Sequence, residues 1–173
     1  MKLKKIFSLG LVGALALSAS GCVNQHPEQN TDDVSGEVRI VATSPAAVDI
    51  CDRLELDLVG VCSSTLSTIP ERYQDVTTVG TAMSPDLEIL KSLNPDYVLS
   101  PNSLQSDLQP KYASIGVNSL FLNLRSVEGM YASIEGLGEK FGREEQAQAL
   151  VDEYEQFMEE YRSQNEGKVS PTV

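Results

Sequence analysis

The sequence predicts an α/β fold built around a parallel β-sheet, and two observations support this class. From Glu37 onward, short β-rich apolar segments alternate with segments in which apolar residues recur at helical spacing. The connections between them carry the Ser, Pro and Asn residues that begin and end helices. Strands and helices that alternate in this way form βαβ units, so we expect one parallel sheet with helices on both faces.

The first helix is marked by its start signal and by its period. Ser44 is a good N-cap, and Pro45 suits the first turn of a helix because its missing N–H would have no partner there. Ala47, Ile50 and Leu54 then follow at three- and four-residue spacing, so this helix presents one apolar face to a core.

A second helix is expected to begin in the same way. Ser84 and Pro85 repeat the start signal, and Asp86 and Glu88 then lie in the first turn, where the helix dipole favours acidic side chains.

The expected elements, in order, are a strand over 38–43, a helix from 45, strands over 58–62 and 76–79, a helix from 84 that stops at Asn94 and Pro95, a strand over 97–100, a helix over 107–115 interrupted near Pro110, a strand over 118–123, and helices over 126–141 and from 143 to about 164.

The carboxyl ends of the strands are the predicted binding surface, because ligands of open parallel sheets bind at that edge. The residues there are small, many carry hydroxyl groups, and none is charged. They are Thr43, Ser44, Pro45, Ser63, Ser64, Thr65, Thr81, Ala82, Ser100 and Asn102. No pair of carboxylates and no nucleophile with a base converges on this edge, and no Gly-rich phosphate loop follows the first strand. We therefore expect a binding protein and not an enzyme.

Composition excludes several other functions. The chain has 173 residues, of which 13 are Lys or Arg and 25 are Asp or Glu, giving a net charge of −12. A nucleic-acid-binding protein needs a basic surface, so this class is excluded. Three widely spaced cysteines and a single histidine provide neither a zinc motif nor a hydrolase triad.

Cys51 and Cys62 could form a disulfide outside the cytoplasm, but the expected geometry opposes it. Cys51 lies near the far end of its helix, whereas Cys62 lies at the carboxyl end of its strand. The two residues are therefore far apart along the direction of the strands. This separation, added to the spacing between the helix and the sheet, exceeds the roughly 7 Å that a disulfide allows between Cα atoms. We expect both to be small core residues.

The first 21 residues have the pattern of a lipoprotein signal peptide. Three lysines precede an apolar run of about 14 residues, which is too short to span a membrane. Small residues then precede Cys22, so we expect cleavage before Cys22 and its acylation, which anchors the protein to the outer face of the cytoplasmic membrane. Residues 22–36 are polar and patternless, typical of a flexible tether, and His26 is expected to be a solvated side chain of it.

The last part of the sequence predicts a long acidic helix over 143–166, whose acidic residues form a solvated face. Residues 167–173 look like the start of another strand. A strand that begins directly after a long helix suggests that a second lobe follows in the complete protein.

Several motifs resemble one family of binding proteins. They are Arg39–Val41, Leu58–Gly60, Ile69–Tyr73, Val79–Pro85, Leu93–Ser100 and Gln109–Pro110. Together they make the chain similar to the substrate-binding lipoproteins that serve ABC importers of haem, siderophores and vitamin B12, and within that group to the haem receptors. The resemblance implies a two-lobed periplasmic-binding-protein fold in which residues 37–142 form the N-terminal α/β lobe, 143–166 the helix between lobes, and 167–173 the start of the C-terminal lobe.

The resemblance also implies a ligand, partners and two functional residues. Met83 matches the methionine that is one axial ligand of the haem iron in the family, and Glu88 matches a glutamate that docks on arginines of the ABC permease. The second axial ligand, a histidine of the other lobe, has no counterpart in this sequence. Haem is thus the expected transported ligand, and the protein is expected to be a monomer.

Three alternatives remain open from the sequence. A siderophore or cobalamin receptor would have the same fold, although siderophore sites usually offer arginine, tyrosine or tryptophan to an anionic ferric complex, and the expected edge is uncharged. A surface lipoprotein with an adhesive or enzymatic role is the alternative from another class. Tyr97 could be a phenolate ligand of haem, but it begins a buried strand, where core packing is the expected role.

Overall fold

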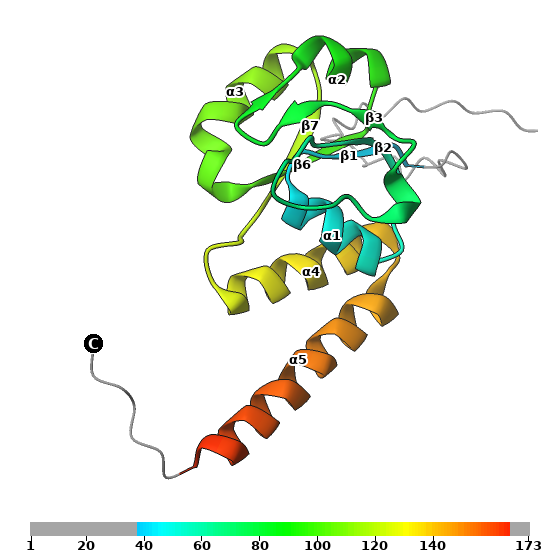
Figure 1. Ribbon diagram of the computed structural model, residues 1–173. Coiled ribbons are helices and arrows are strands. Elements are labelled where there is room, and N and C mark those ends of the chain that lie inside the picture. Colours follow the sequence, from blue (N-terminus) through cyan, green and yellow to red (C-terminus); the bar gives the residue numbers. More distant parts are fainter. Residues whose placement is uncertain (1–37, 167–173) are drawn as a thin grey trace, which may run out of the picture. The chain divides into compact units, whose positions relative to one another are not determined.

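The computed structural model describes residues 38–166, all of which belong to one compact unit, Gly36–Val173. The predicted signal peptide, Cys22 and the tether lie outside the described residues, as does the segment 167–173. The elements of Figure 1 are β1 (Ile40–Ala42), α1 (Pro45–Arg53), β2 (Leu58–Val61), the 3-10 helix η1 (Glu71–Tyr73), β3 (Thr77–Thr78), β4 (Gly80–Thr81), β5 (Ser84–Pro85), α2 (Leu87–Leu93), β6 (Tyr97–Pro101), the 3-10 helix η2 (Asn102–Leu104), α3 (Gln105–Ser114), β7 (Asn118–Leu122), α4 (Val127–Phe141) and α5 (Glu144–Asn165).

Five strands form one parallel sheet in the order β3-β2-β1-β6-β7, and the predicted α/β class is confirmed. The central strand β1 pairs on both sides, so that Val41 lies opposite Gly60 of β2 and Val98 of β6. The chain therefore builds outward from β1 in one direction through β2 and β3, and in the other through β6 and β7. The strands β4 and β5 form a separate antiparallel hairpin.

Alternation along β1 divides the core between the two faces of the sheet. Ile40 and Ala42 belong to a cluster completed by α1, α4 and the first turn of α5, whereas Val41 belongs to a cluster completed by α2 and α3. Figure 1 shows α2 and α3 above the sheet and α1 and α4 below it. Both faces are covered, as expected for a parallel sheet.

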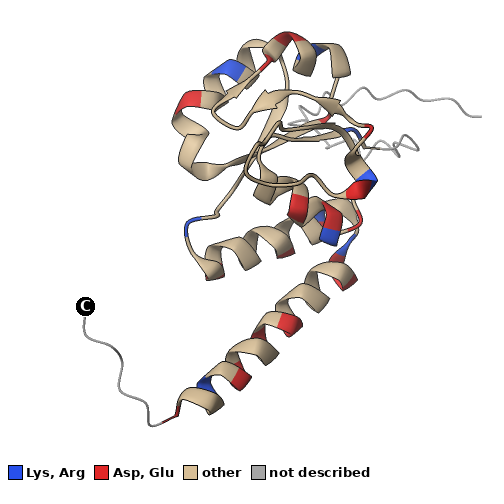
Figure 2. Ribbon diagram, viewed as in Figure 1, with Lys and Arg blue, Asp and Glu red and all other residues tan. Residues whose placement is uncertain are grey.

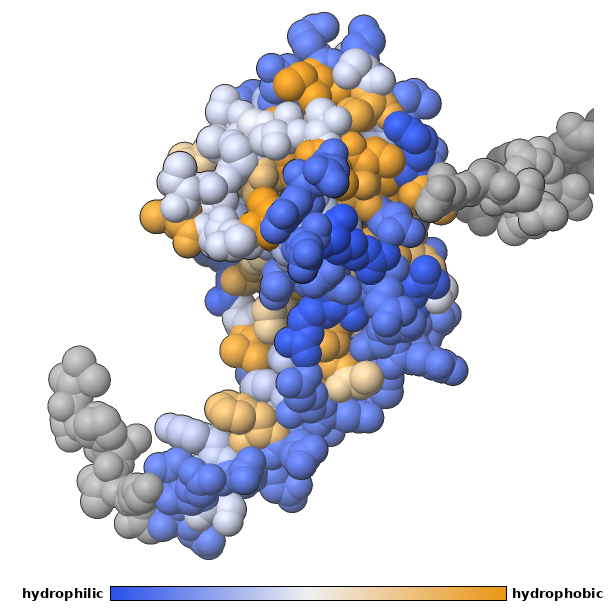
Figure 3. Space-filling view, turned by 45° about the vertical axis from the view of Figure 1, so that its right-hand side comes forward, coloured by the Kyte–Doolittle hydropathy of each residue, from blue (hydrophilic) through white to orange (hydrophobic). Residues whose placement is uncertain are grey.

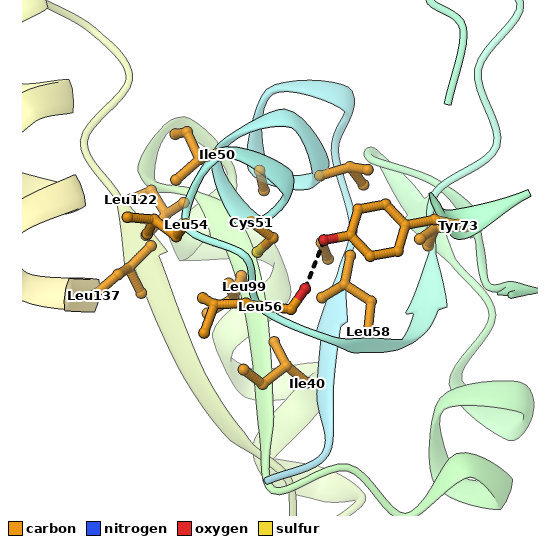
Figure 4. Close-up of a cluster of buried hydrophobic side chains, with 14 of the residues drawn as sticks. Ile40, Ile50, Cys51, Leu54, Leu56, Leu58, Tyr73, Leu99, Leu122 and Leu137 are labelled. Atoms are coloured by element: carbon orange, nitrogen blue, oxygen red, sulfur yellow. Dashed lines mark hydrogen bonds between the residues drawn. The ribbon is translucent and has the colours of Figure 1, made fainter. Parts of the chain in front are cut away.

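The larger cluster contains one buried polar contact, shown in Figure 4. Tyr73 is 2% exposed, and its hydroxyl donates a hydrogen bond of 2.6 Å to the carbonyl oxygen of Leu56. The bond satisfies both the phenol and a buried carbonyl, each of which would otherwise be costly to bury. Burial raises the pKa of Tyr73, so the phenol stays protonated at neutral pH.

The same cluster contains both cysteines. Cys51 of α1 and Cys62 after β2 are buried free thiols. This agrees with the prediction that the two residues lie too far apart for a disulfide. Burial raises the pKa of the Cys51 thiol to about 12 and also raises the pKa of Cys62.

Gly60 of β2 permits a close approach of three side chains to the sheet. A Cβ atom at this position would lie 2.8 Å from Cδ1 of Leu93, 2.9 Å from Cγ1 of Val79 and 3.0 Å from Cγ2 of Val41. These distances are shorter than van der Waals contact, so a larger residue would push α2 away from the sheet.

The predicted starts of the first two helices had different outcomes. Ser44 caps α1 as predicted, with its Oγ accepting a hydrogen bond of 3.3 Å from the N–H of Ala47. The prediction that Ser84 and Pro85 begin the next helix is wrong, because both residues pair with β4 in the hairpin. The cap of α2 is Asp86, whose Oδ1 accepts from the N–H groups of Glu88 and Ile89, at 3.0 Å each.

Two further corrections concern α3 and the strands. Pro110 does not interrupt α3, which runs without a break from Gln105 to Ser114. The proline deprives only the carbonyl of Ser106 of its helical partner, and both residues are exposed, so water can replace that bond. The strands predicted over 38–43 and 76–79 are shorter, because pairing extends only over Ile40–Ala42 and Thr77–Thr78.

The helix α5 packs against the lobe only through its first half. Tyr154 stacks on Tyr131 of α4 with ring centroids 4.6 Å apart, and Glu153 forms an ion pair with Arg53 of α1. The second half extends away from the sheet (Figure 1) and carries several acidic residues (Figure 2), and hydrophilic residues dominate the face of it that Figure 3 shows. The predicted solvation of the acidic residues is confirmed, since all are exposed: Glu144, Glu145, Asp152, Glu153, Glu155, Glu159 and Glu160. Within residues 38–166, no helix combines the length and hydropathy needed to cross a membrane.

The buried thiol of Cys51 predicts a loss of stability at alkaline pH. The folded thiol keeps its proton up to about pH 12, whereas the unfolded thiol loses it near its ordinary pKa of 9.0. Above pH 9 the unfolded state therefore binds fewer protons, and the free energy of unfolding falls as pH rises, by roughly 1 kcal/mol between pH 8 and 10. Urea unfolding at a series of pH values measures this slope.

The control for this prediction is Cys51→Ala, which removes the titrating group. The variant should show a shallower fall between pH 8 and 10, whatever its stability at pH 7. Parallel curves for the two proteins would contradict the assignment of the slope to Cys51.

Candidate functional site

The carboxyl ends of the five parallel strands lie along one edge of the sheet. The point where the strand order reverses is between β1 and β6, and the segments that leave these strands begin with Thr43 and Asn102. Crevices at such reversal points are the usual binding sites of open α/β sheets. In Figure 1 this edge is on the left, where the chain leaves β7 to enter α4.

Beneath this edge, three hydroxyl groups form a buried network. Thr43 and Ser100 are fully buried, and their Oγ atoms are 2.7 Å apart. Thr43 also donates to the carbonyl of Leu99 at 3.1 Å, and Ser100 lies 3.0 Å from the hydroxyl of Tyr112. Burial raises the pKa of Tyr112, so its phenol stays protonated at neutral pH. Because Thr43 and Ser100 are occupied with one another, they support the binding edge from below and do not reach its surface.

The larger of two hollows at this edge has a volume of about 520 Å³. Its walls come from the start of α1, the loop after β2 and the segments that follow β6 and β7. They are Ser44, Pro45, Ala46, Asp49, Ser67, Thr68, Ile69, Pro70, Pro101 and Leu124. Asp49 is the only charged residue among them, so the edge is not entirely uncharged as the sequence suggested.

The second hollow, of about 480 Å³, adjoins the first because Pro45 lines both. It lies between the loop after β2 and the β4–β5 hairpin. Its walls are Pro45, Ser63, Ser64, Thr65, Leu66, Thr81, Ala82 and Met83. Seven of the ten predicted edge residues thus line one hollow or the other. The three that do not are Thr43, Ser100 and Asn102.

Asn102 belongs to a side-chain pair beside the hollows. Its Nδ2 donates to Oδ1 of Asn123 at 3.2 Å, and that same oxygen accepts from the N–H of Arg125 at 3.3 Å. The pair connects the segments that follow β6 and β7. Its role is therefore to join two neighbouring loops of the edge.

Met83 lies at the tip of the hairpin, where Ala82 and Met83 form the two-residue turn between β4 and β5. Gly80 begins the hairpin with φ of +92°, a conformation that favours glycine, and a Cβ there would lie 2.8 Å from the carbonyl oxygen of Ser84. Met83 is 77% exposed. Its thioether is therefore available to a ligand and is not part of the core.

The opposite wall of this hollow is presented by the loop after β2. Ser64 Oγ accepts hydrogen bonds from the N–H groups of Leu66 at 3.2 Å and Ser67 at 3.0 Å, which fixes a turn. Leu66 at this turn is 96% exposed. The N–H of Ser63 donates to the carbonyl of Gly80 at 2.7 Å, so the loop is tied to the hairpin that carries Met83.

Two other predicted residues lie away from the hollows. Glu88 is an exposed residue in the first turn of α2, and its backbone N–H donates to Oδ1 of the cap Asp86. Tyr97 begins β6 at the opposite edge of the sheet. Its ring packs edge-to-face on that of Phe141, with the ring centroids 5.5 Å apart, and Nζ of Lys140 lies 4.5 Å from the centroid of the Tyr97 ring. Tyr97 is half-buried and packs on these two neighbours, outside both core clusters, so the predicted core role is met only in part. It does not line either hollow.

The chemistry available at this edge is that of binding. The donors in the hollow of Met83 are hydroxyl groups, backbone groups and one thioether. Within the described part of the chain, no three or more His, Cys, Asp or Glu residues come close enough to hold a metal ion.

Comparison with known proteins identifies the family. The model of the periplasmic binding protein family matches residues 40–173. The chain belongs to this family. Its members are binding proteins that act outside the cytoplasm, so the prediction of a binding protein and not an enzyme is confirmed, and the enzymatic alternative is removed.

Individual relatives agree with this assignment. The high-affinity heme uptake system protein IsdE of Staphylococcus aureus strain Newman is 34% identical over 152 residues, which are 88% of this chain and 50% of that protein. The chain thus spans about half the length of the curated relatives it matches. The predicted resemblance to the haem receptors of this family is confirmed.

Two solved structures show the same fold. One is an ABC transporter substrate-binding protein from Listeria monocytogenes EGD-e, with a TM-score of 0.76 and 39% identity over 80% of this chain and 53% of that one. The other is Staphylococcus aureus IsdE complexed with heme, with a TM-score of 0.73 and 34% identity over 78% of this chain and 52% of that one. The matched region is again about half of each relative.

Sequence reasoning missed several of the residues that line the two hollows. Asp49 lies four residues after Pro45, on the same face of α1, and this spacing could have placed it at the edge. Leu66 is a single apolar residue among serines and threonines, so no periodicity marks it as part of a site. Leu124 carries no local signal, because only the tertiary structure brings the segment after β7 to the hollow beside the start of α1.

Proposed function

We propose that this chain is the N-terminal lobe of a lipoprotein that binds haem and delivers it to the permease of an ABC importer. The observation that carries the proposal is the exposed thioether of Met83 beside a hollow of about 480 Å³ at the binding edge. The similarity to the heme uptake protein IsdE at 34% identity supports haem as the ligand.

Met83 is proposed as one axial ligand of the haem iron. A thioether is a soft donor that haem iron accepts, whereas the other side chains around this hollow offer only hydroxyl oxygens or no donor. The hairpin tip exposes the sulfur to the solvent side, where a flat ligand can approach without rearrangement of the core. The hollow beside Met83 is proposed to receive one face of the porphyrin.

Charge supports haem over an anionic ferric siderophore. The walls of the two hollows contain no arginine or lysine, and their only charged side chain is Asp49. No charged side chain lines the hollow of Met83, so this hollow suits the apolar face of a porphyrin, whereas an anionic ferric complex finds no cation on either set of walls. A siderophore or cobalamin receptor remains the alternative of the same fold.

Haem has two apolar faces, and a single lobe covers one of them. A second lobe is therefore proposed to cover the other face and to supply the second axial ligand. The helix α5 is proposed as the connection between lobes, within the range 143–166, and 167–173 as the start of the second lobe. In support, Phe157 and Tyr161 near the end of α5 are 60% and 55% exposed and stack at 6.4 Å, which leaves an apolar surface available for packing.

Glu88 is proposed as the residue that docks on the permease. Its carboxylate is exposed in the first turn of α2, and the cap of that helix is supplied by Asp86, so α2 does not need the Glu88 side chain. A free carboxylate at the surface suits an electrostatic contact with arginines of a partner.

The membrane anchor is proposed on the sequence pattern alone. Residues 1–21 are the proposed signal peptide, Cys22 the acylated residue, and 22–36 the tether that links the anchor to the lobe. This arrangement would keep the binding edge near the permease at the outer face of the membrane.

The first test concerns Met83, in the protein expressed in full from its own reading frame. Met83→Leu keeps an apolar side chain of similar size but removes the sulfur, so the Soret and visible bands of bound haem should shift and haem loss to apomyoglobin should accelerate. The unfolding free energy should change little, because Met83 is 77% exposed. Absorption spectra and transfer kinetics measure both effects, and unchanged spectra would mean that another residue holds the iron.

The second test separates docking from binding. Glu88→Ala should leave haem affinity and stability at their parental values, since an exposed first-turn carboxylate contributes only a few tenths of a kcal/mol. Haem-dependent growth and uptake should slow. The matched control is Glu128→Ala, which removes an exposed first-turn glutamate from α4. Equal uptake by both variants and the parent would refute the docking role.

The third test concerns the anchor. Cys22→Ser removes the acylation site, so the protein should no longer incorporate a fatty-acid probe and should appear unprocessed or shed into the medium. Metabolic labelling followed by fractionation measures both, with Cys51→Ala as a control because that cysteine is buried in the core. Equal label in Cys22→Ser and the parent would exclude lipidation at Cys22.

A further inference from the structure

The two most exposed large apolar side chains of the described residues line the same hollow. Leu66 is 96% exposed and Met83 is 77% exposed, whereas the other four such side chains range from 41% to 60%. Single exposed apolar residues are common, but two that face one hollow mark a surface that a ligand covers. The iron proposed to bind Met83 does not explain Leu66, which has no donor atom.

The backbone holds these two side chains in a fixed relation. Ser64 fixes the turn that presents Leu66, through hydrogen bonds to two consecutive N–H groups. The N–H of Ser63 donates to the carbonyl of Gly80 at 2.7 Å, which connects this loop to the hairpin that ends in Met83. Leu66 is therefore held out into solvent by a defined turn, at the cost of exposing an apolar side chain.

We propose that Leu66 is a specificity-determining residue that packs on the flat apolar face of the ligand beside Met83. This inference rests on the proposed function, and it assigns Leu66 a contact with the porphyrin ring that is independent of the iron. Met83 selects for a metal that accepts sulfur, and Leu66 selects for a large apolar face. Hydrophilic ferric complexes satisfy neither requirement, since they offer hard oxygen donors to the metal and little apolar surface to Leu66.

Two ligands separate the two contacts: haem, and protoporphyrin IX, which has the same ring without iron. The test uses the protein expressed in full from its own reading frame and measures the dissociation constant of each ligand by fluorescence quenching. Leu66→Ala should weaken both ligands by a similar factor of about ten, because the apolar contact is lost in both complexes. Leu66→Met should bind both nearly as well as the parent.

The comparison variants are Met83→Leu and Val127→Ala. Met83→Leu should weaken haem several-fold more than protoporphyrin IX, because only haem loses an iron ligand. Val127→Ala removes an apolar side chain that is 43% exposed and lies outside both hollows, so it should change neither affinity. Urea unfolding of each variant verifies that the fold is retained, as expected for changes at exposed positions.

Three results would overturn the inference. Parental affinities in Leu66→Ala would show that the side chain does not contact the ligand. A loss for haem alone would show that Leu66 acts through the iron site, and an equal loss in Val127→Ala would show non-specific adsorption. If the parent binds neither porphyrin, the proposed function itself fails, which is distinct from a failure confined to Leu66.

Discussion

The structure depends on the parallel pairing of β1 with strands on both of its sides. Because β2 and β6 run in the same direction as β1, every connecting segment leaves the sheet at the same edge. The reversal of strand order at β1 opens the space between the segments after β1 and β6. The hollows, the hairpin with Met83 and the loop with Leu66 all occupy this edge because of that pairing.

Below this edge of the sheet the side chains are fixed by hydrogen bonds, whereas the loops above it expose apolar side chains. Thr43, Ser100 and Tyr112 satisfy one another's hydroxyl groups within the core, which fixes the ends of β1 and β6 without placing polar groups on the surface. Above them, the loops expose Leu66 and Met83, side chains that a stable core would bury. The hydrogen-bonded strand ends therefore hold the loops in place, and Leu66 and Met83 stay exposed above them.

Part of the candidate site could be predicted from the sequence, and there are physical reasons why the rest could not. The α/β class and most element positions follow from apolar periodicity and cap signals, which are local properties. The hairpin was missed because Ser84 and Pro85 have the local pattern of a helix start. Their strand pairing with Gly80 and Thr81 is a contact that the local pattern does not contain.

The sequence by itself determined the class of fold, the capping of α1 and the burial of Cys51 and Cys62 as free thiols. Only the tertiary structure decided which of the edge residues line a hollow. Thr43 and Ser100 have the same hydroxyl chemistry as Ser63 and Thr81, yet the first two are buried in a network and the other two line a hollow. The reason is that exposure depends on which segments pack above a strand end, and this is set by contacts between elements distant along the chain.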